Sequence, residues 1–186
     1  MKSSHVKASV ACYFRYTRQF PLVTFERSFK EYFIKPDILV VTKNRKLIEV
    51  EVKVSLSDLK NDIKKRGWVL RQKYPDLYMM PYQFYYAVPS PLKDKAIEII
   101  KGWKDDGYMN GDAGLICVLD KDNLGYNDVF VAIKAPINKE ALTLSLKNVV
   151  KMVKDQTGTL CSCAVKIAKL ENGTYLDQYF KNGQGI

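Results

Sequence analysis

The segment from Lys35 to Lys53, KPDILVVTKNRKLIEVEVK, constrains the fold of this chain more than any other. Its first part, Asp37 to Thr42, is a nearly unbroken apolar run, and its second part, Leu47 to Val54, alternates between charged and valine residues after its first two positions. Alternation with a period of two is typical of a β-strand with two different faces. The polar turn at 43–46 is short enough to join antiparallel strands. The segment therefore predicts a β-hairpin.

The charged face of the second strand is unusual, because Glu49, Glu51 and Lys53 line up on it. Asp37, at the start of the first strand, supplies a further carboxylate. Carboxylates on paired strands can hold Mg²⁺, a hard cation that prefers oxygen ligands and keeps several waters. A lysine on the same face can position the attacking water or stabilise the charge that develops on a phosphate. The alternative interpretation is a solvated strand face on which Lys53 pairs with an acid.

The order of these residues resembles the PD-(D/E)xK nuclease superfamily. The matching motif is Pro36-Asp37 followed, after a gap, by Glu51-Val52-Lys53. Three further segments, VEVKVSLSDLKNDIKK, QFYYAVPSPL and DAGLICVL, are similar to the MmcB-type family of DNA-repair nucleases. The resemblance spans Pro36 to Leu119. The sequence departs from the family's Asp-x-Lys-Trp motif, because Lys65 occupies the tryptophan position and the tryptophan is displaced to Trp68.

The resemblance implies a metal-dependent nuclease that hydrolyses DNA phosphodiester bonds in DNA repair or processing. Its catalytic residues would be Asp37, Glu51 and Lys53, with Mg²⁺ or Mn²⁺ bound by the two carboxylates. It also implies that Asp62 braces the site through Lys53 or Lys64. Glu49 and Glu26 are two further candidate supporting acids. For Glu49 three interpretations stay open: a metal ligand, a hydrogen-bond acceptor behind the ligands, or a solvated residue. For Glu26 and its reserve, Glu31, the residues alone favour a surface acid.

The net charge of +10 is concentrated in the first part of the chain. Residues 1–76 hold 17 Lys and Arg against 8 Asp and Glu, whereas residues 77–186 hold 13 against 12. A field of this sign favours a polyanion as partner. We expect DNA, including single-stranded or branched forms, and the candidate contacts are Lys64, Lys65, Arg66, Arg71 and Lys73. Nearby tyrosines (Tyr74, Tyr78 and Tyr82) suit base stacking or, equally, core packing.

The length fits a single domain over 1–186, with a catalytic core at about 20–135 and a helical C-terminal tail at 136–180. Helices are predicted at 4–18, from Ser57 as N-cap through Trp68, at 92–104, and from Pro136 onward with a break at Gly158. Strands are predicted at 22–29, 37–42, 47–54, 83–88, 113–119 and 129–135. Together they predict an α/β fold, a restriction-endonuclease-like sandwich with a central mixed sheet flanked by helices. The second and third strands are expected at its centre.

Several classes are disfavoured by composition. Cys161-Ser-Cys163 lacks the further ligands of a closed zinc site, and His5, the single histidine, argues against a hydrolase with a histidine base. The acidic run at 120–123 lacks the glycine and glutamate of a calcium loop. No apolar run reaches membrane-spanning length, no secretory signal is evident, and the four cysteines indicate a reducing cytoplasm. A nucleic-acid-binding module that does not cut is the alternative function, and homodimer formation is left open.

Overall fold

The computed structural model describes residues 1–26, 35–74, 80–119 and 129–171, with side chains up to residue 158. Three positions considered above, Glu31, Tyr78 and the acidic run at 120–123, lie outside the described residues. The chain divides into two compact units, Met1–Leu144 and Ser145–Ile186. All the candidate site residues that are described belong to the first unit. In the described residues, no helix is long and apolar enough to cross a membrane.

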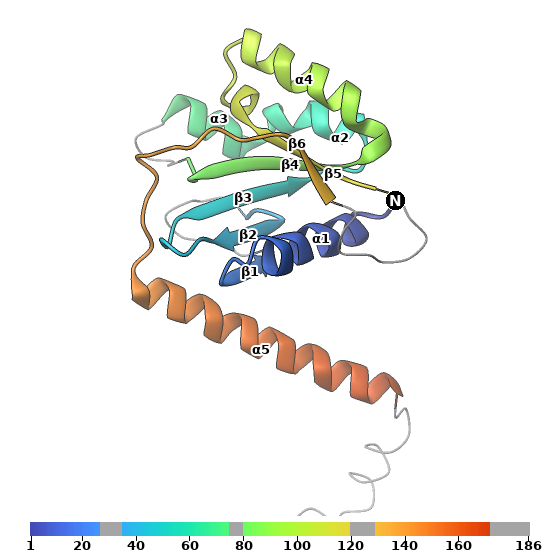
Figure 1. Cartoon of the computed structure of the whole chain (residues 1–186), viewed down its shortest axis with the longest axis vertical. Helices are drawn as coiled ribbons and strands as arrows, with labels where there is room; N and C mark the ends of the chain where they lie inside the picture. The colour runs from blue at the N-terminus through green and yellow to red at the C-terminus, as the bar shows by residue number, and fades with distance from the viewer. Residues whose placement is uncertain (27–34, 75–79, 120–128, 172–186) are drawn as a thin grey trace, which may run out of the picture. The chain divides into compact units, whose positions relative to one another are not determined.

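A six-stranded mixed sheet forms the centre of the first unit (Figure 1). Its spatial order follows the chain: β1 (Leu22–Phe25), β2 (Ile38–Val41), β3 (Leu47–Val52), β4 (Gln83–Pro89), β5 (Gly114–Val118) and β6 (Val129–Ile133). The first three strands are mutually antiparallel, β3, β4 and β5 are parallel, and β6 returns antiparallel to β5. The predicted hairpin is confirmed as β2 and β3. The expected central position holds for β3 alone, because β2 lies beside the edge strand β1.

Helices cover both faces of this sheet, which confirms the predicted α/β architecture (Figure 1). One face packs on α1 (Ser3–Cys12) and the π-helical turn that follows it (Tyr13–Thr17), through a core that includes Val6, Val10 and the β3 residues Val50 and Val52. The other face packs on α2 (Leu56–Asn61), α3 (Arg66–Lys73) and α4 (Lys93–Asp105). The alternation in β3 therefore sends its valines toward α1 and its charged residues toward the other face.

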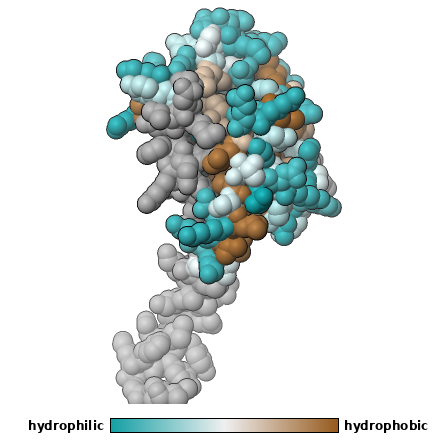
Figure 2. Space-filling view, turned by 90° about the vertical axis from the view of Figure 1, so that its left-hand side faces the viewer, coloured by the Kyte–Doolittle hydropathy of each residue, from teal (hydrophilic) through white to brown (hydrophobic). Residues whose placement is uncertain are grey.

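The charged face of β3 thus meets helices instead of solvent. On the same face of the sheet, an aromatic cluster from β4, α3 and α4 fills the core: Phe84, Tyr86, Trp68 and Trp103. The outer side of α4 is hydrophilic, as expected from its amphipathic sequence, and the region at the top of Figure 2, where α4 lies, is mostly teal. The charged residues of β3 consequently lie on the helix-covered face, where Glu49 is buried and Glu51 is partly exposed.

Three helix predictions were wrong in detail. Ser55, not Ser57, caps α2, because its hydroxyl accepts a hydrogen bond from the Asp58 amide at 3.2 Å. The expected continuous helix is interrupted after a 3₁₀ turn (Asp62–Lys64) by the extended backbone of Lys65, after which α3 begins. Residues 136–145 are not helical, and α5 (Leu146–Glu171) continues through Gly158 without a break.

Candidate functional site

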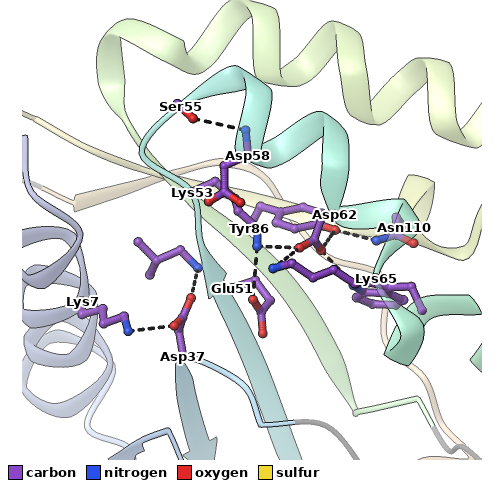
Figure 3. Close-up of polar contacts among 12 residues, drawn as sticks. Lys7, Asp37, Glu51, Lys53, Ser55, Asp58, Asp62, Lys65, Tyr86 and Asn110 are labelled. Carbon is purple, nitrogen blue, oxygen red and sulfur yellow. Dashed lines mark hydrogen bonds and ion pairs between the residues drawn. The ribbon is translucent and has the colours of Figure 1, made fainter.

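The predicted Asp37 and Glu51 lie opposite each other at one end of the sheet. The pairing of Ile38 with Val50 places Asp37, one residue before β2, across from Glu51, near the end of β3. Directly opposite residues of an antiparallel pair share a face of the sheet. Figure 3 shows both carboxylates at this end, on neighbouring strands. The two acids that the hairpin motif singles out are therefore brought together.

Two hydrogen-bonding groups fix the Asp37 carboxylate. Its Oδ2 accepts the backbone N–H of Val52 at 2.8 Å, and its Oδ1 forms an ion pair with Lys7 Nζ at 2.8 Å (Figure 3). Lys7 also reaches Glu26 Oε1 at 3.0 Å, so this α1 lysine joins two of the predicted acids. The bonds from Lys7 and Lys35 lower the pKa of Glu26. A cation bound by Asp37 would compete with Lys7 for one of its oxygens.

Glu51 is the least neutralised of the buried acids in the cluster. Its Oε2 lies 3.3 Å from Lys53 Nζ, and its side chain keeps 14% exposure. Burial raises the pKa of Glu51 to about 7, since the opposing charge of Lys53 is offset by the repelling carboxylates of Asp37 and Asp62. A bound cation stabilises such a poorly solvated carboxylate more than it stabilises a carboxylate that is exposed to water.

Asp62 lies at the centre of a buried network on the other side of Lys53. Lys53 Nζ is 2.5 Å from Asp62 Oδ1, and Lys65 Nζ approaches the same oxygen at 2.8 Å. Asp62 Oδ2 accepts hydrogen bonds from Trp68 Nε1 at 2.8 Å and from the Tyr86 hydroxyl at 2.7 Å. Burial by itself would raise the pKa of Asp62, but the two lysines and Tyr86 outweigh it, and the pKa is lowered.

This network holds Lys53 in place. The Lys53 side chain is only 2% exposed and is shared between Asp62 and Glu51. The bracing of Lys53 by Asp62 is thus seen, although the second lysine is Lys65 and not Lys64. Asn110 extends the network by donating to the Tyr86 hydroxyl at 2.5 Å (Figure 3). Asp62 also raises the pKa of Lys65, which is otherwise half exposed.

The displaced tryptophan, Trp68, contacts Asp62 although it does not stand at the tryptophan position of the Asp-x-Lys-Trp motif. Trp68 is buried and its indole N–H donates to Asp62, in an edge-on arrangement with Phe84 at a centroid distance of 4.7 Å. Because Lys65 ends the 3₁₀ turn, α3 begins one residue later and carries Trp68 back toward Asp62. The shift in sequence is therefore compensated by the break between the helices.

Glu49 and Arg71 correct two expectations. Glu49 is 2% exposed, which rules out the solvated alternative, and both of its oxygens accept from Arg71 Nη2 at 2.9 and 3.0 Å. Arg71 was expected to contact nucleic acid, but its side chain is fully buried beside Glu49, with its guanidinium 5.0 Å from the Trp68 ring. Burial raises the pKa of Glu49, and Arg71 opposes that rise. This pair belongs to the internal framework of the site.

The remaining predicted nucleic-acid contacts lie on α3 and on the turn that precedes it. Lys64, Arg66 and Lys73 are exposed, and Lys65 is half exposed despite its bond to Asp62. They belong to the same stretch of chain as Asp62 and Trp68. Exposed lysines and arginines commonly contact the phosphate groups of nucleic acids.

The donor set fits Mg²⁺ or Mn²⁺ in the sense that two carboxylates lie at the same end of neighbouring strands. Mg²⁺ is commonly bound through one or two carboxylates and keeps several waters, so Asp37 and Glu51 are sufficient in number. In the part of the chain with described side chains, no cluster of three or more His, Cys, Asp or Glu side chains is arranged to hold a metal ion. A complete all-protein cage is therefore absent from the described residues.

Lys7, Tyr86 and Asn110 were not identified from the sequence as site residues, and Lys65 was predicted only as a nucleic-acid contact. Lys7 is 30 positions before its partner Asp37 in the sequence, and no motif marks it as a site residue. Tyr86 carries a weak signal, since its hydroxyl lies in an apolar strand and needs a hydrogen-bond partner when buried, whereas Asn110 lies in a polar turn segment that gives no such signal. Contacts between residues this far apart in the sequence are set by the fold and cannot be read from local sequence patterns.

The fold and the charged cluster define an α/β protein with a mixed sheet and paired acidic and basic side chains at one end of it. No family model matches the chain, and no curated protein matches it. A solved structure of a protein of unknown function from Silicibacter pomeroyi is similar, with a TM-score of 0.51 and 14% sequence identity, over 100% of this chain and 97% of that chain. This likeness shows a shared fold.

Proposed function

We propose that this protein is a metal-dependent nuclease of the PD-(D/E)xK type, related to the MmcB-type proteins, that hydrolyses DNA phosphodiester bonds in repair or processing. The observation that carries the proposal is the position of Asp37 opposite Glu51, with the buried Lys53 ammonium 3.3 Å from Glu51. The mixed sheet with helices on both faces is compatible with a restriction-endonuclease-like sandwich. The excess of positive charge in residues 1–76 supports a nucleic-acid substrate.

The roles follow from the contacts. Asp37 and Glu51 would hold Mg²⁺ or Mn²⁺, which when bound polarises the phosphate and lowers the pKa of a water. Asp37 is oriented by the Val52 amide. Lys53, held by Asp62, directs its ammonium toward Glu51 and supplies positive charge where the phosphate gains negative charge. A charge fixed by a buried partner needs little reorganisation during the reaction.

The surface lysines and arginine of the α2–α3 region, Lys64, Lys65, Arg66 and Lys73, would contact the DNA backbone. We include single-stranded and branched DNA among the substrates. The cytoplasmic location and a homodimer stay predictions.

The test is cleavage of single-stranded, duplex and branched DNA with Mg²⁺ or Mn²⁺, and again with a chelator. We expect cutting that the chelator stops and that Asp37→Asn or Lys53→Met reduces by at least about a hundredfold. Matched controls are Asp105→Asn and Lys95→Met, both on the exposed side of α4. Thermal unfolding of every variant separates loss of chemistry from loss of folding. DNA binding without any cutting by the wild-type protein would refute the enzyme and favour the binding module.

A further inference from the structure

A second feature with the characteristics of a ligand site lies at the other end of the sheet. A cavity of about 840 Å³ is lined there by the β2–β3 turn, the starts of β3 and β4, the π-helical turn after α1, and residues near the end of β6. Its volume lies in the range of small-molecule sites. Ile48, at the start of β3, lines the cavity, whereas Glu51, near the end of β3, belongs to the carboxylate cluster. The two sites are therefore separate.

Aromatic side chains form much of the cavity wall. Phe14 and Tyr85 are buried in the core beneath it, while Tyr13, Phe20 and Tyr82 keep partly exposed rings. Phe14 lies 5.9 Å from Phe20 with a tilt of 31°, and it meets Tyr13 and Tyr85 edge-on at interplanar angles of 68° and 62°, so the rings form one continuous aromatic cluster. Flat aromatic ligands stack on such surfaces, and the energy gained is comparable for every nucleobase.

The local backbone is shaped to place these groups. The five residues from Tyr13 to Thr17 form a π-helix, a rare conformation that is concentrated at functional sites. Gln19 follows with a φ of 53°, in the left-handed region that costs energy for a residue with a side chain. These two irregularities turn Arg18 and Phe20 into the same cavity, with the Arg18 guanidinium 6.0 Å from the Phe20 ring.

The charge of the cavity has one sign. Arg18, Lys43, Lys46 and Lys134 line it, and no Asp or Glu is present among the described residues of the lining. Lys46 donates to the Ala141 carbonyl. Lys43 and Lys134 are exposed and form no ion pair within the described part of the chain. Unpaired cations of this kind attract a phosphate group.

We propose that this cavity binds a nucleotide, with the base against the aromatic wall and the phosphate among Arg18, Lys43 and Lys134. The combination of rings and unopposed cations selects a ligand that is both flat and anionic. Two sources share this chemistry, a free nucleoside monophosphate and one nucleotide of a single-stranded nucleic acid. The inference does not depend on the proposed nuclease activity, because none of the cavity residues belongs to the carboxylate cluster.

Calorimetric titration of the full chain, in buffer with a chelator, tests this inference. The probes are dAMP, adenosine, inorganic phosphate and a short single strand of deoxyadenosines. The charge-reversal variant Lys43→Glu/Lys134→Glu is compared with the matched control Lys95→Glu/Lys101→Glu on the exposed side of α4. Phe20→Leu removes one ring of the wall. Because metal is absent, these titrations report on the cavity, whereas cutting assays with Mg²⁺ report on the carboxylates.

We expect wild-type protein to bind dAMP more tightly than adenosine or phosphate. The charge-reversal variant should weaken binding by about tenfold or more, Phe20→Leu by about tenfold, and the control variant by less than about twofold. If the single strand binds tightly and dAMP binds weakly, and the cavity variants weaken binding of the strand, the natural ligand is a nucleotide within a single strand. The inference fails if neither dAMP nor the strand binds, if phosphate binds as tightly as dAMP, or if the cavity variants bind like wild type.

Discussion

Glu49 and Glu51 are the same residue type on the same face of one strand, two positions apart, yet their surroundings differ. Glu49 receives both of its bonds from Arg71 and is sealed beneath α3. Glu51 shares a single lysine with Asp62, keeps some exposure, and has a pKa raised to about 7 by burial. The first carboxylate is paired with an arginine at both oxygens, and the second shares one lysine with another acid.

This difference shows how a structural acid can be separated from a candidate metal ligand. A buried charge whose partner is also buried contributes to the framework, since removing one partner leaves the other charge buried and unpaired. A buried charge with an incomplete partner retains attraction for an external ion. The following variants test whether the two glutamates differ in the way their contacts indicate.

Arg71→Met is expected to have the largest effect on stability. It leaves the Glu49 carboxylate buried without a partner, which costs about 3–5 kcal/mol of unfolding free energy. Chemical denaturation measures the loss. The double variant Glu49→Met/Arg71→Met should recover most of it, because Arg71 Nε and Nη1 have no hydrogen-bond partner in the described part of the chain. A single variant as stable as wild type would show that the pair is not structural.

Glu51→Gln is expected to behave in the opposite way in the metal-free protein. The folded-state pKa of Glu51 is about 7, above the ordinary value of 4.5, so the folded state binds more protons between these pH values. Stability contributed by the protonated form is present below about pH 4.5 and is lost as the pH rises through about 7. The variant should therefore match wild type near pH 4.5 and exceed it by about 1–3 kcal/mol near pH 8.

Denaturation curves at both pH values, with a chelator present, measure this effect. Glu98→Gln, a matched change on the exposed side of α4, should give no pH-dependent difference from wild type. A Glu51→Gln variant that is less stable than wild type at pH 8 would assign this glutamate a structural role like that of Glu49.

The contrast between the glutamates also marks how far the sequence could be interpreted. Period-two alternation predicts that Glu49, Glu51 and Lys53 share a face, and this is correct because strand geometry is local. It cannot predict which helix residue will lie over each carboxylate. Arg71 is 22 positions from Glu49, in a segment whose many cations resemble a solvated surface. Its burial follows only from the packing of α3 on the sheet.

The same limit explains the other differences. The hairpin, the four other strands (β1, β4, β5 and β6) and α4 were predicted from hydrophobic periodicity, which is a short-range signal. The interruption at Lys65 and the extended path of residues 136–145 depend on contacts made elsewhere: Lys65 with Asp62, and Leu144 with the Arg45 carbonyl. Lys7 was missed because nothing in its own neighbourhood indicates that α1 packs with this lysine beside Asp37.

Tyr86→Phe tests the network behind Glu51 and should have a moderate effect. It removes one of two donors to Asp62 Oδ2 and leaves the Asn110 amide without its acceptor, at a cost of about 1–2 kcal/mol. Denaturation measures the loss, and Tyr108→Phe, a partly exposed tyrosine, is the matched control. Because Lys65 and Trp68 still hold Asp62, DNA cutting, if present, should fall less than in Lys53→Met. An unchanged stability would mean that Trp68 satisfies Asp62 by itself.

Ser55→Ala is expected to have the smallest effect and tests how the chain turns from the end of β3 into α2. The Ser55 hydroxyl accepts from the Asp58 amide, and loss of such a cap costs about 1 kcal/mol. The neighbouring Ser57→Ala removes a hydroxyl that contacts Ser55 at 3.0 Å but caps nothing, so its cost should be a few tenths of a kcal/mol at most. Denaturation of the two variants side by side decides between the caps. Equal losses would indicate that the contact between the two hydroxyls, and not the cap, stabilises this turn.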